Sequence, residues 1–392
     1  MVIPTLNLVM RSFDMEIIFA VLFLLSIYSY FLYPIILKFF PNRVIGKAVS
    51  NGGNKLPRLT FIITAYNEED RIREKIENSL SIKYDEDLIE IIVASDCSTD
   101  STDSIVKEYS DRGISLVRAD DRKGKEYAQL CAIKKAQGDI LVFSDVATQV
   151  KPESLQNLTK YFNDSSVGAI SSEDVFISQD GSIAGEGAYV KYEMWLRRLE
   201  SNKGGLVGLS GSFFAARKEI CEAWDIGVPS DFNTALNCAK AGKVAVSCSD
   251  VVGYYQDVKN PALEYRRKNR TIIRGITALA KHPEALNPFK MGLFSFQIWG
   301  HKIMRWAEPW FMIGFLFISF ALANDHIFYA SIFWMQIIFY SLVLIGFFIA
   351  ASREYIFIKL PFFFVQVNIA IAHSTIQYIL GKRITVWQPS KR

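Results

Sequence analysis

Polar side chains stand where three short apolar, β-branched runs of this chain end: Tyr66-Asn67-Glu68, Asp96 and Asp145. Asp96 offers an acceptor for a ring N–H group, and Tyr66 offers a planar face for stacking. Asp145 suits a diphosphate or the metal ion that accompanies it. Each carboxylate alone could equally cap a following helix. Three carboxylates at strand ends of one sheet predict a nucleotide pocket.

The elements that would position these residues alternate between β-branched runs and charged, amphipathic stretches. This alternation is typical of an α/β fold with a parallel sheet, in which ligands bind at the carboxyl ends of the strands. No GxGxxG turn follows the first strand, which argues against a dinucleotide-dependent oxidoreductase. Strands are expected over residues 59–65, 88–95 and 139–144, and helices over residues 68–80, 102–109 and 124–136.

Five short motifs occur in order between about residues 59 and 279. Together they resemble the inverting family 2 glycosyltransferases, many of which are membrane-bound and make bacterial polysaccharides, whereas each motif alone is weak. The resemblance implies a GT-A fold, an α/β, Rossmann-like nucleotide-sugar-binding domain, here flanked by transmembrane helices. The motifs are Ile63-Thr64-Ala65-Tyr66-Asn67-Glu68, Ser95-Asp96-Cys97-Ser98-Thr99-Asp100, Arg122-Lys123-Gly124-Lys125, Phe143-Ser144-Asp145-Val146-Ala147-Thr148 and Gly208-Leu209-Ser210-Gly211.

By this resemblance, the first two motifs would bind the nucleoside of a nucleotide-sugar donor, with a UDP-sugar expected. The residues concerned are Ala65, Tyr66, Glu68 and Asp96.

Asp145 corresponds to the first acid of the family's DxD motif, which binds the donor through a divalent metal, Mg²⁺ or Mn²⁺. The third position of that motif is Ala147 in this chain. A hard cation prefers several oxygen ligands, so the loss of one carboxylate weakens coordination by the protein, while phosphate oxygens and water can complete the shell. Ser144 and Thr148 could offer substitute oxygens or could merely cap the following turn.

Inverting transfer needs one carboxylate that removes the proton of the attacking acceptor hydroxyl. The family carries this base in a pair of acids, and Ser230-Asp231 stands at the corresponding place. The resemblance makes Asp231 the expected catalytic base, with Ser230 where the other acid would be. The alternative is that Asp231 only caps a helix over residues 232–241.

Basic side chains are expected at the departing diphosphate, because positive charge stabilises it as the bond breaks. The resemblance places Lys123 or Lys125 at the phosphates, although both could belong to a solvated turn. In the QxxRW helix of processive relatives, Arg267 takes the place of the glutamine and Arg270 matches the arginine. Thr271 replaces the tryptophan, which puts processivity in doubt. This basic run could also be a membrane-facing surface.

Long apolar runs suggest transmembrane helices, since a span needs roughly 20 such residues. Residues 15–40 are predicted to be an anchor and not a cleaved signal peptide, because the run is long and aromatic and lacks a clear cleavage site. Two or three more spans are expected within residues 309–380. The remaining expected segments are an N-terminal tail (1–14), a linker (41–56), the GT-A domain (57–285), an amphipathic interfacial helix (286–308) and a basic C-terminal tail (381–392).

Charge next to the first run indicates orientation. Lys38, Arg43, Lys47, Lys55 and Arg58 follow it without an intervening acid, which favours a cytosolic catalytic domain and an inner-membrane protein. The net charge of +4 fits an anionic leaflet better than nucleic acid. The five cysteines show no paired metal spacing, and none is assigned a role.

The sequence therefore predicts a membrane glycosyltransferase that moves a sugar, with inversion, from a nucleotide-sugar to a lipid-linked or growing polysaccharide acceptor, in cell-envelope or exopolysaccharide synthesis. Oligomers or accessory subunits are possible partners. The alternative is a catalytically degraded nucleotide-sugar-binding membrane protein, for which Ala147 and Ser230 speak. Turnover of a donor would distinguish the two.

Overall fold

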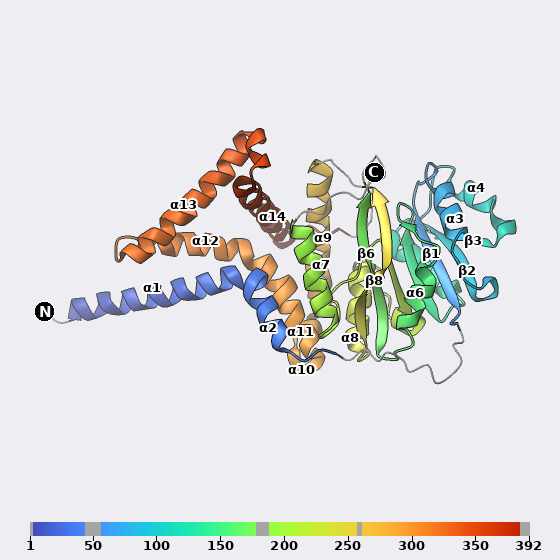
Figure 1. The fold of residues 1–392 in the computed structure, drawn as a ribbon, viewed down its shortest axis with the longest axis horizontal. Helices are drawn as coiled ribbons and strands as arrows, with labels where there is room; N and C mark the ends of the chain where they lie inside the picture. Colours follow the sequence, from blue (N-terminus) through green and yellow to red (C-terminus); the bar gives the residue numbers. More distant parts are fainter. Residues whose placement is uncertain (1–2, 44–55, 178–187, 257–260, 385–392) are drawn as a thin grey trace. The chain divides into compact units, whose positions relative to one another are not determined.

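A computed structural model describes residues 3–43, 56–177, 188–256 and 261–384 (Figure 1). The chain divides into two compact units. The helical unit comprises the described residues up to Ile36 together with Lys268–Ile273 and Trp299–Lys382. The sheet unit comprises the described residues of Leu37–Arg267 and Arg274–Ile298, together with residues 383 and 384.

One eight-stranded sheet organises the sheet unit, in the order β3-β2-β1-β4-β7-β6-β8-β5. Its first four strands run parallel, which is the arrangement that the alternating sequence pattern predicts. The strands expected from residues 59, 88 and 139 are all present to within a residue or so. These four strands are β1 (Leu59–Ala65), β2 (Ile89–Ser95), β3 (Ile114–Arg118) and β4 (Ile140–Asp145).

The other half of the sheet is mixed. Strand β7 pairs antiparallel to β4 and to β6, β6 pairs parallel to β8, and β5 pairs antiparallel to β8. Such a mixed edge on a parallel sheet is common in large α/β sheets. These strands are β5 (Gln149–Val150), β6 (Val167–Ile177), β7 (Phe213–Arg217) and β8 (Val244–Gln256).

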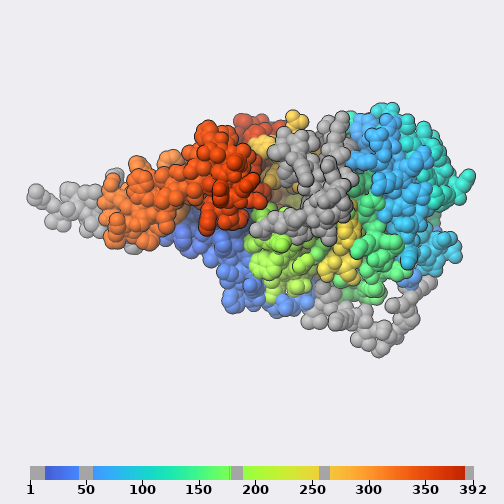
Figure 2. All heavy atoms as spheres, turned by 45° about the horizontal axis from the view of Figure 1, so that its top comes forward, coloured from blue at the N-terminus to red at the C-terminus, as the bar shows by residue number. Residues whose placement is uncertain are grey.

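Helices cover both faces of the sheet. Phe61 and Ile63 of β1 point into a core that also contains the apolar faces of α3, α4 and α6. On the other face, Phe143 of β4 stacks on Phe214 and Trp224. In the space-filling view, the segments coloured blue to green after residue 55 form one continuous body (Figure 2). The helices are α3 (Ile72–Leu80), α4 (Thr102–Lys107), α5 (Lys125–Lys135), α6 (Ser154–Tyr161), α7 (Ala188–Ser201) and α8 (Ser230–Lys240).

Helix α9 (Pro261–Lys281) carries the basic run, and its residues are shared between the two units. Its final stretch returns to the sheet unit at Arg274. There the guanidinium of Arg274 lies 2.6 Å from the Glu126 carboxylate of α5, with both side chains largely buried. Trp224 donates its indole N–H to the backbone carbonyl of Glu126 at 2.9 Å. This buried ion pair fixes the end of α9 against α5.

The helical unit consists of long apolar helices. Three stretches among the described residues are long and apolar enough to cross a membrane: Asp14–Phe39, Ile327–Phe348 and Ile356–Ile379. The helix that begins at Met304 is not one of them and contains Pro309. The helices are α1 (Ile3–Ile27), α2 (Tyr33–Phe39), α12 (Met304–Leu322), α13 (Ile327–Phe348) and α14 (Ile356–Ile379), with a π-helical stretch, Tyr28–Leu32, between α1 and α2.

The expectation of one amphipathic interfacial helix over residues 286–308 was wrong. The segment breaks at Gly292, whose positive φ of 53° interrupts the helical path. Two of its apolar side chains, Phe294 and Ile298, are buried. The segment instead contains α10 (Pro288–Met291), α11 (Leu293–Ile298), a π-helical stretch (Trp299–Ile303) and the start of α12.

Candidate active site

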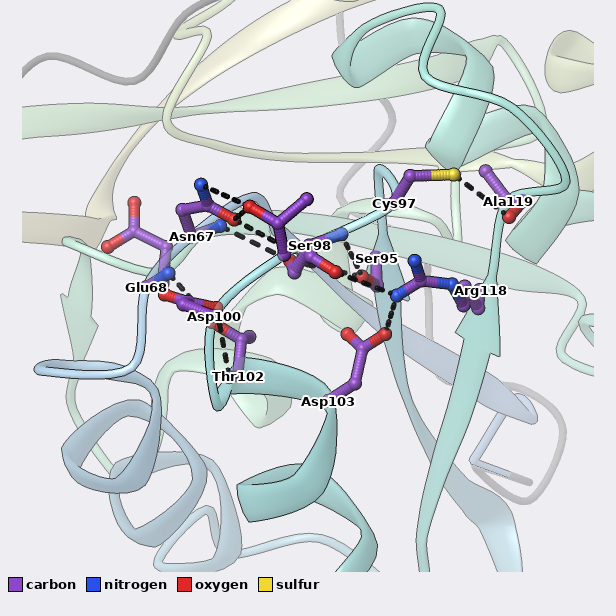
Figure 3. A network of polar contacts seen from close by, with 11 residues as sticks. Asn67, Glu68, Ser95, Cys97, Ser98, Asp100, Thr102, Asp103, Arg118 and Ala119 are labelled. Atoms are coloured by element: carbon purple, nitrogen blue, oxygen red, sulfur yellow. Dashed lines mark hydrogen bonds and ion pairs between the residues drawn. The ribbon is translucent and has the colours of Figure 1, made fainter.

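The loops that follow β1 and β2 interlock at the carboxyl edge of the sheet (Figure 3). Asn67 and Cys97 both adopt the left-handed conformation, with φ of 51° and 57°, which few non-glycine residues adopt. The Asn67 side chain accepts the backbone N–H of Thr99 at 2.8 Å, and the backbone N–H of Glu68 donates to Thr102 at 2.8 Å. The two loops therefore form one rigid rim.

Asp96 directly follows β2, at the start of the second of these loops, and is fully buried. Its backbone N–H donates to the carbonyl of Ala65, and its Oδ1 accepts from the backbone N–H groups of Lys123 and Gly124 at 3.2 and 3.0 Å. Burial raises the pKa of Asp96, and these two N–H donors oppose the rise. Its buried Oδ2 has no hydrogen-bond partner among the described residues. An acceptor left in this state suits an N–H donor of a ligand.

Two residues predicted at the nucleoside have protein partners of their own. The guanidinium of Arg122 lies 3.9 Å from the centre of the Tyr66 ring and covers one of its two faces. Glu68 is nearly buried and pairs with Arg71, with Nε 2.9 Å and Nη2 2.5 Å from its Oε2. Burial raises the pKa of Glu68, while Arg71 opposes the rise.

The two candidate phosphate lysines differ sharply. The Lys125 side chain is 7% exposed, and its ammonium donates to Oδ1 of Asp145 at 2.5 Å and to the carbonyl of Gly211 at 2.7 Å. The Lys123 side chain is 44% exposed and lies 3.7 Å from Asp121 on the surface. Of the two candidates, Lys125 is therefore the one in contact with Asp145, and the exposure of Lys123 is that expected of a solvated turn.

Asp231 reaches the same place from helix α8. A Cβ atom on Gly211 would lie 3.2 Å from Oδ2 of Asp231, so this carboxylate is in contact with the loop that Lys125 holds. Pro229 and not Asp231 is the N-cap of the helix, so Asp231 lies in its first turn. Oδ1 of Asp231 accepts only its neighbour's backbone N–H, that of Phe232, among the hydrogen bonds of the described residues.

Asp174 of β6, which was not predicted as a site residue, holds this loop. The hydroxyls of Ser210 and Ser212 donate to its Oδ1 at 2.6 and 3.2 Å. Ser171, also on β6, accepts the backbone N–H of Ser210 at 2.7 Å. Burial raises the pKa of Asp174, and the two serine hydroxyls oppose the rise. An acid within a strand belongs to no recognisable sequence motif. Asp174 reaches the loop because β6 pairs with β7, the strand that follows the loop.

Arg267 and Arg270 lie one turn apart on α9, and both are partly buried. Arg267 belongs to the sheet unit, whereas Arg270 groups with the helical unit. Their roles at a diphosphate remain predictions.

A divalent cation would find one carboxylate here. The described residues contain no group of three or more His, Cys, Asp or Glu side chains able to hold a metal, and position 147 is alanine. Proteins often bind Mg²⁺ through one or two carboxylates together with substrate phosphates and water. The residues thus fit a cation held chiefly by the donor's diphosphate, with Asp145 as its protein ligand.

The sequence profile described as "Glycosyl transferase family 2" matches residues 60–224. Those residues contain the interlocked rim, Lys125, Asp145 and the loop around Gly211. Residues 60–224 of this chain belong to glycosyl transferase family 2.

Relatives of this family 2 domain make polysaccharides and glycolipids. A poly-beta-1,6-N-acetyl-D-glucosamine synthase of Staphylococcus aureus (strain MSSA476) is 28% identical over 172 residues, which are 42% of this chain and 40% of the relative. A beta-monoglucosyldiacylglycerol synthase of Nostoc sp. is 25% identical over 179 residues, 43% of this chain and 38% of the relative. The chain therefore spans less than half the length of these relatives.

A solved structure supports the GT-A fold. The mannosyltransferase PcManGT from Pyrobaculum calidifontis, in complex with GDP-Man and Mn²⁺, superposes with a TM-score of 0.69 at 22% identity. The match covers 94% of this chain and 100% of that one. The mixed sheet with its parallel half is thus a GT-A sheet, as the sequence predicts.

Proposed function

We propose that this protein transfers a sugar, with inversion, from a nucleotide-sugar to a hydroxyl of a lipid-linked or growing polysaccharide acceptor. A UDP-sugar is the proposed donor. The observation that carries the proposal is the position of Gly211 between Lys125 and Asp231, because it brings a candidate diphosphate site and a candidate base to one loop.

Asp231 is the proposed general base. In a direct displacement, the acceptor hydroxyl attacks the anomeric carbon while the carboxylate takes its proton. The loop from Gly208 to Ser212 would set the distance between this carboxylate and the donor, because Asp174 and Ser171 fix its serine residues. Oδ2 of Asp96 would accept the ring N–H of the base, for which it has the buried position and the vacant acceptor.

Lys125 is the proposed electrostatic partner of the departing diphosphate, with Arg267 and Arg270 as further candidates. A fixed ammonium in a largely buried site needs little reorganisation as charge develops on the leaving group. A bound Mg²⁺ or Mn²⁺ next to Asp145 would supply additional neutralisation of the diphosphate.

The apolar helices suggest where the acceptor comes from. An inner-membrane protein with a cytosolic catalytic domain is proposed from the lysines and arginines that follow the first candidate span. A lipid-linked acceptor or a growing chain could then approach from the membrane side. Crosslinking in native membranes tests whether the protein acts alone or with further subunits.

A catalytically degraded binding protein is the second candidate. Ala147 and Ser230 favour it, since each replaces an acid of the family pattern. The two candidates differ in turnover: a binding protein would take up a nucleotide without consuming any donor.

The test is release of nucleoside diphosphate from a panel of UDP- and GDP-sugars by the purified full chain in lipid nanodiscs, with and without Mn²⁺. Turnover of one donor, with a product of opposite anomeric configuration, would support the proposal. Binding of nucleoside diphosphate without turnover of any donor in the panel would support the degraded binding protein instead.

A further inference from the structure

Lys75 is a buried lysine that has no role in the proposed reaction. It lies on α3, within the sheet unit, and none of its surface is exposed. Its ammonium donates to the hydroxyl of Ser144 at 2.8 Å and to the backbone carbonyl of Thr148 at 2.5 Å. The Phe61 ring lies on another side, with its centre 5.3 Å from Nζ.

Both hydrogen bonds of Lys75 end on the turn that carries Asp145. Ser144 precedes Asp145 at the end of β4, and Thr148 closes the turn with a backbone N–H bond to the Asp145 carbonyl at 3.2 Å. The backbone N–H of Asp145 donates in turn to the carbonyl of Ser212 at 2.9 Å. Lys75 thus fixes both ends of the turn from inside the protein, while Ser212 fixes Asp145 from the neighbouring loop.

A buried ammonium is costly to desolvate, and an apolar side chain of similar length would fill the same space without that cost. Burial lowers the pKa of Lys75 to about 7, and the Asp145 carboxylate opposes the fall. Asp145 is therefore the acid that favours the charged form of Lys75. The same carboxylate also receives Lys125, so two ammonium groups act on one acid.

We propose that Lys75 is a positioning residue for the diphosphate of the donor. Its ammonium holds the turn from Ser144 to Thr148 in the shape that receives phosphate, and with Lys125 it leaves a positive balance around Asp145. This positive charge offsets part of the diphosphate charge that the cation would otherwise neutralise, since Ala147 leaves the cation one carboxylate ligand fewer than the family pattern has. The inference rests on the proposed function, because it assumes that a nucleoside diphosphate binds at this turn.

The test compares UDP with uridine, because only UDP carries the phosphates. Lys75→Met removes the charge and both hydrogen bonds with little change of shape. In the full chain in nanodiscs, calorimetric titration should show UDP affinity about tenfold weaker in this variant, as expected for charge-assisted contacts, and uridine affinity within about twofold of wild type. A merely structural role would change both affinities alike.

Lys203→Met is the matched control. Lys203 is also buried in the sheet unit and donates to two backbone carbonyls, those of Lys38 and Phe40. Its replacement should leave both affinities unchanged. Ser144→Ala, which removes one acceptor of Lys75, provides a second variant if Lys75→Met does not fold, with an expected loss of UDP affinity of about threefold.

Three results decide the outcome. Selective loss of UDP affinity in Lys75→Met, or in Ser144→Ala where only that variant folds, supports the inference. Unchanged UDP affinity, or an equal loss of UDP and uridine affinity, overturns it while the proposed function stands. Wild-type protein that binds neither UDP nor GDP overturns the proposed function and this inference with it.

Discussion

The ammonium of Lys125 lies 2.5 Å from Oδ1 of Asp145, and the two side chains are 7% and 23% exposed. Lys125 continues to the carbonyl of Gly211, the residue in contact with Asp231. The first residue of α5 thus links the turn after β4 to the first turn of α8. In the proposed function, this fixed positive charge faces the departing diphosphate.

Lys125→Met should lower kcat/KM by about 100-fold, because it removes a preorganised charge from the leaving group. Lys123→Met is the matched control, since Lys123 lies two residues earlier and is largely solvated. It should stay within about threefold of wild type, as exposed ion pairs contribute little. The measurement is steady-state nucleotide release by both variants, and equal losses would contradict the assignment of Lys125.

Gly211→Ala should reduce turnover about tenfold, because a 1 Å misplacement of a reacting group can cost up to about 100-fold. The added Cβ would stand 3.2 Å from Oδ2 of Asp231, which must then shift. Gly208 belongs to the same loop, and a Cβ there would meet nothing within 4 Å. Gly208→Ala should therefore remain close to wild type. Comparison of kcat for the two variants tests whether this loop places the base.

Ala147→Asp should strengthen the response to metal. It places a second carboxylate two positions after Asp145, as in the family's DxD motif. Each further oxygen ligand favours binding of a hard cation. The Mn²⁺ concentration that gives half-maximal activity should fall about tenfold relative to wild type, because the added carboxylate ligand strengthens Mn²⁺ binding. An unchanged Mn²⁺ titration would show that this position does not face the cation.

The pKa of Lys75 predicts how stability depends on pH. Its folded-state pKa of about 7 lies below the ordinary value of 10.5. Between these values the unfolded chain binds more protons than the folded one, so this group makes the folded state relatively more stable as the pH rises from about 7 to 10.5. The Tm of wild type minus that of Lys75→Met should therefore increase over pH 7 to 9.5. A difference that stays constant or decreases with pH would contradict this assignment.

The parallel half of the sheet could be predicted because β1 and β4 are buried throughout most of their length. Such strands appear as continuous apolar runs that end abruptly in polar residues. The mixed half was not predicted. Strand β6 contains the polar residues Ser171, Ser172 and Asp174. Their side chains form hydrogen bonds with residues 210–213 and do not line a solvent-exposed face. Alternation, the usual signal of a half-buried strand, is lost there.

The burial of Lys75 could have been predicted from the sequence. In α3 the buried positions are Ile72, Lys75, Ile76 and Ser79, a spacing of three and four residues that marks one helix face. A lysine on that face is buried by the same geometry as its apolar neighbours. Its partners could not be derived, since they lie on β4 and the turn after it, about 70 residues along the chain.

The expected interfacial helix failed for a different reason. The apolar residues of this segment include Phe294 and Ile298, and both are buried in α11. A pattern of apolar residues indicates what a helix buries without indicating whether lipid or protein covers it.

The most direct test of the account is nucleotide release by Asp231→Asn beside wild type, together with UDP binding by both proteins. The amide keeps the shape of the side chain but cannot take the acceptor's proton, so turnover should fall by about a thousandfold, in the range of general-base catalysis. UDP affinity should remain within about twofold of wild type, because Asp231 does not face the phosphates in this account. Turnover in Asp231→Asn within tenfold of wild type would contradict the claim that Asp231 is the catalytic base.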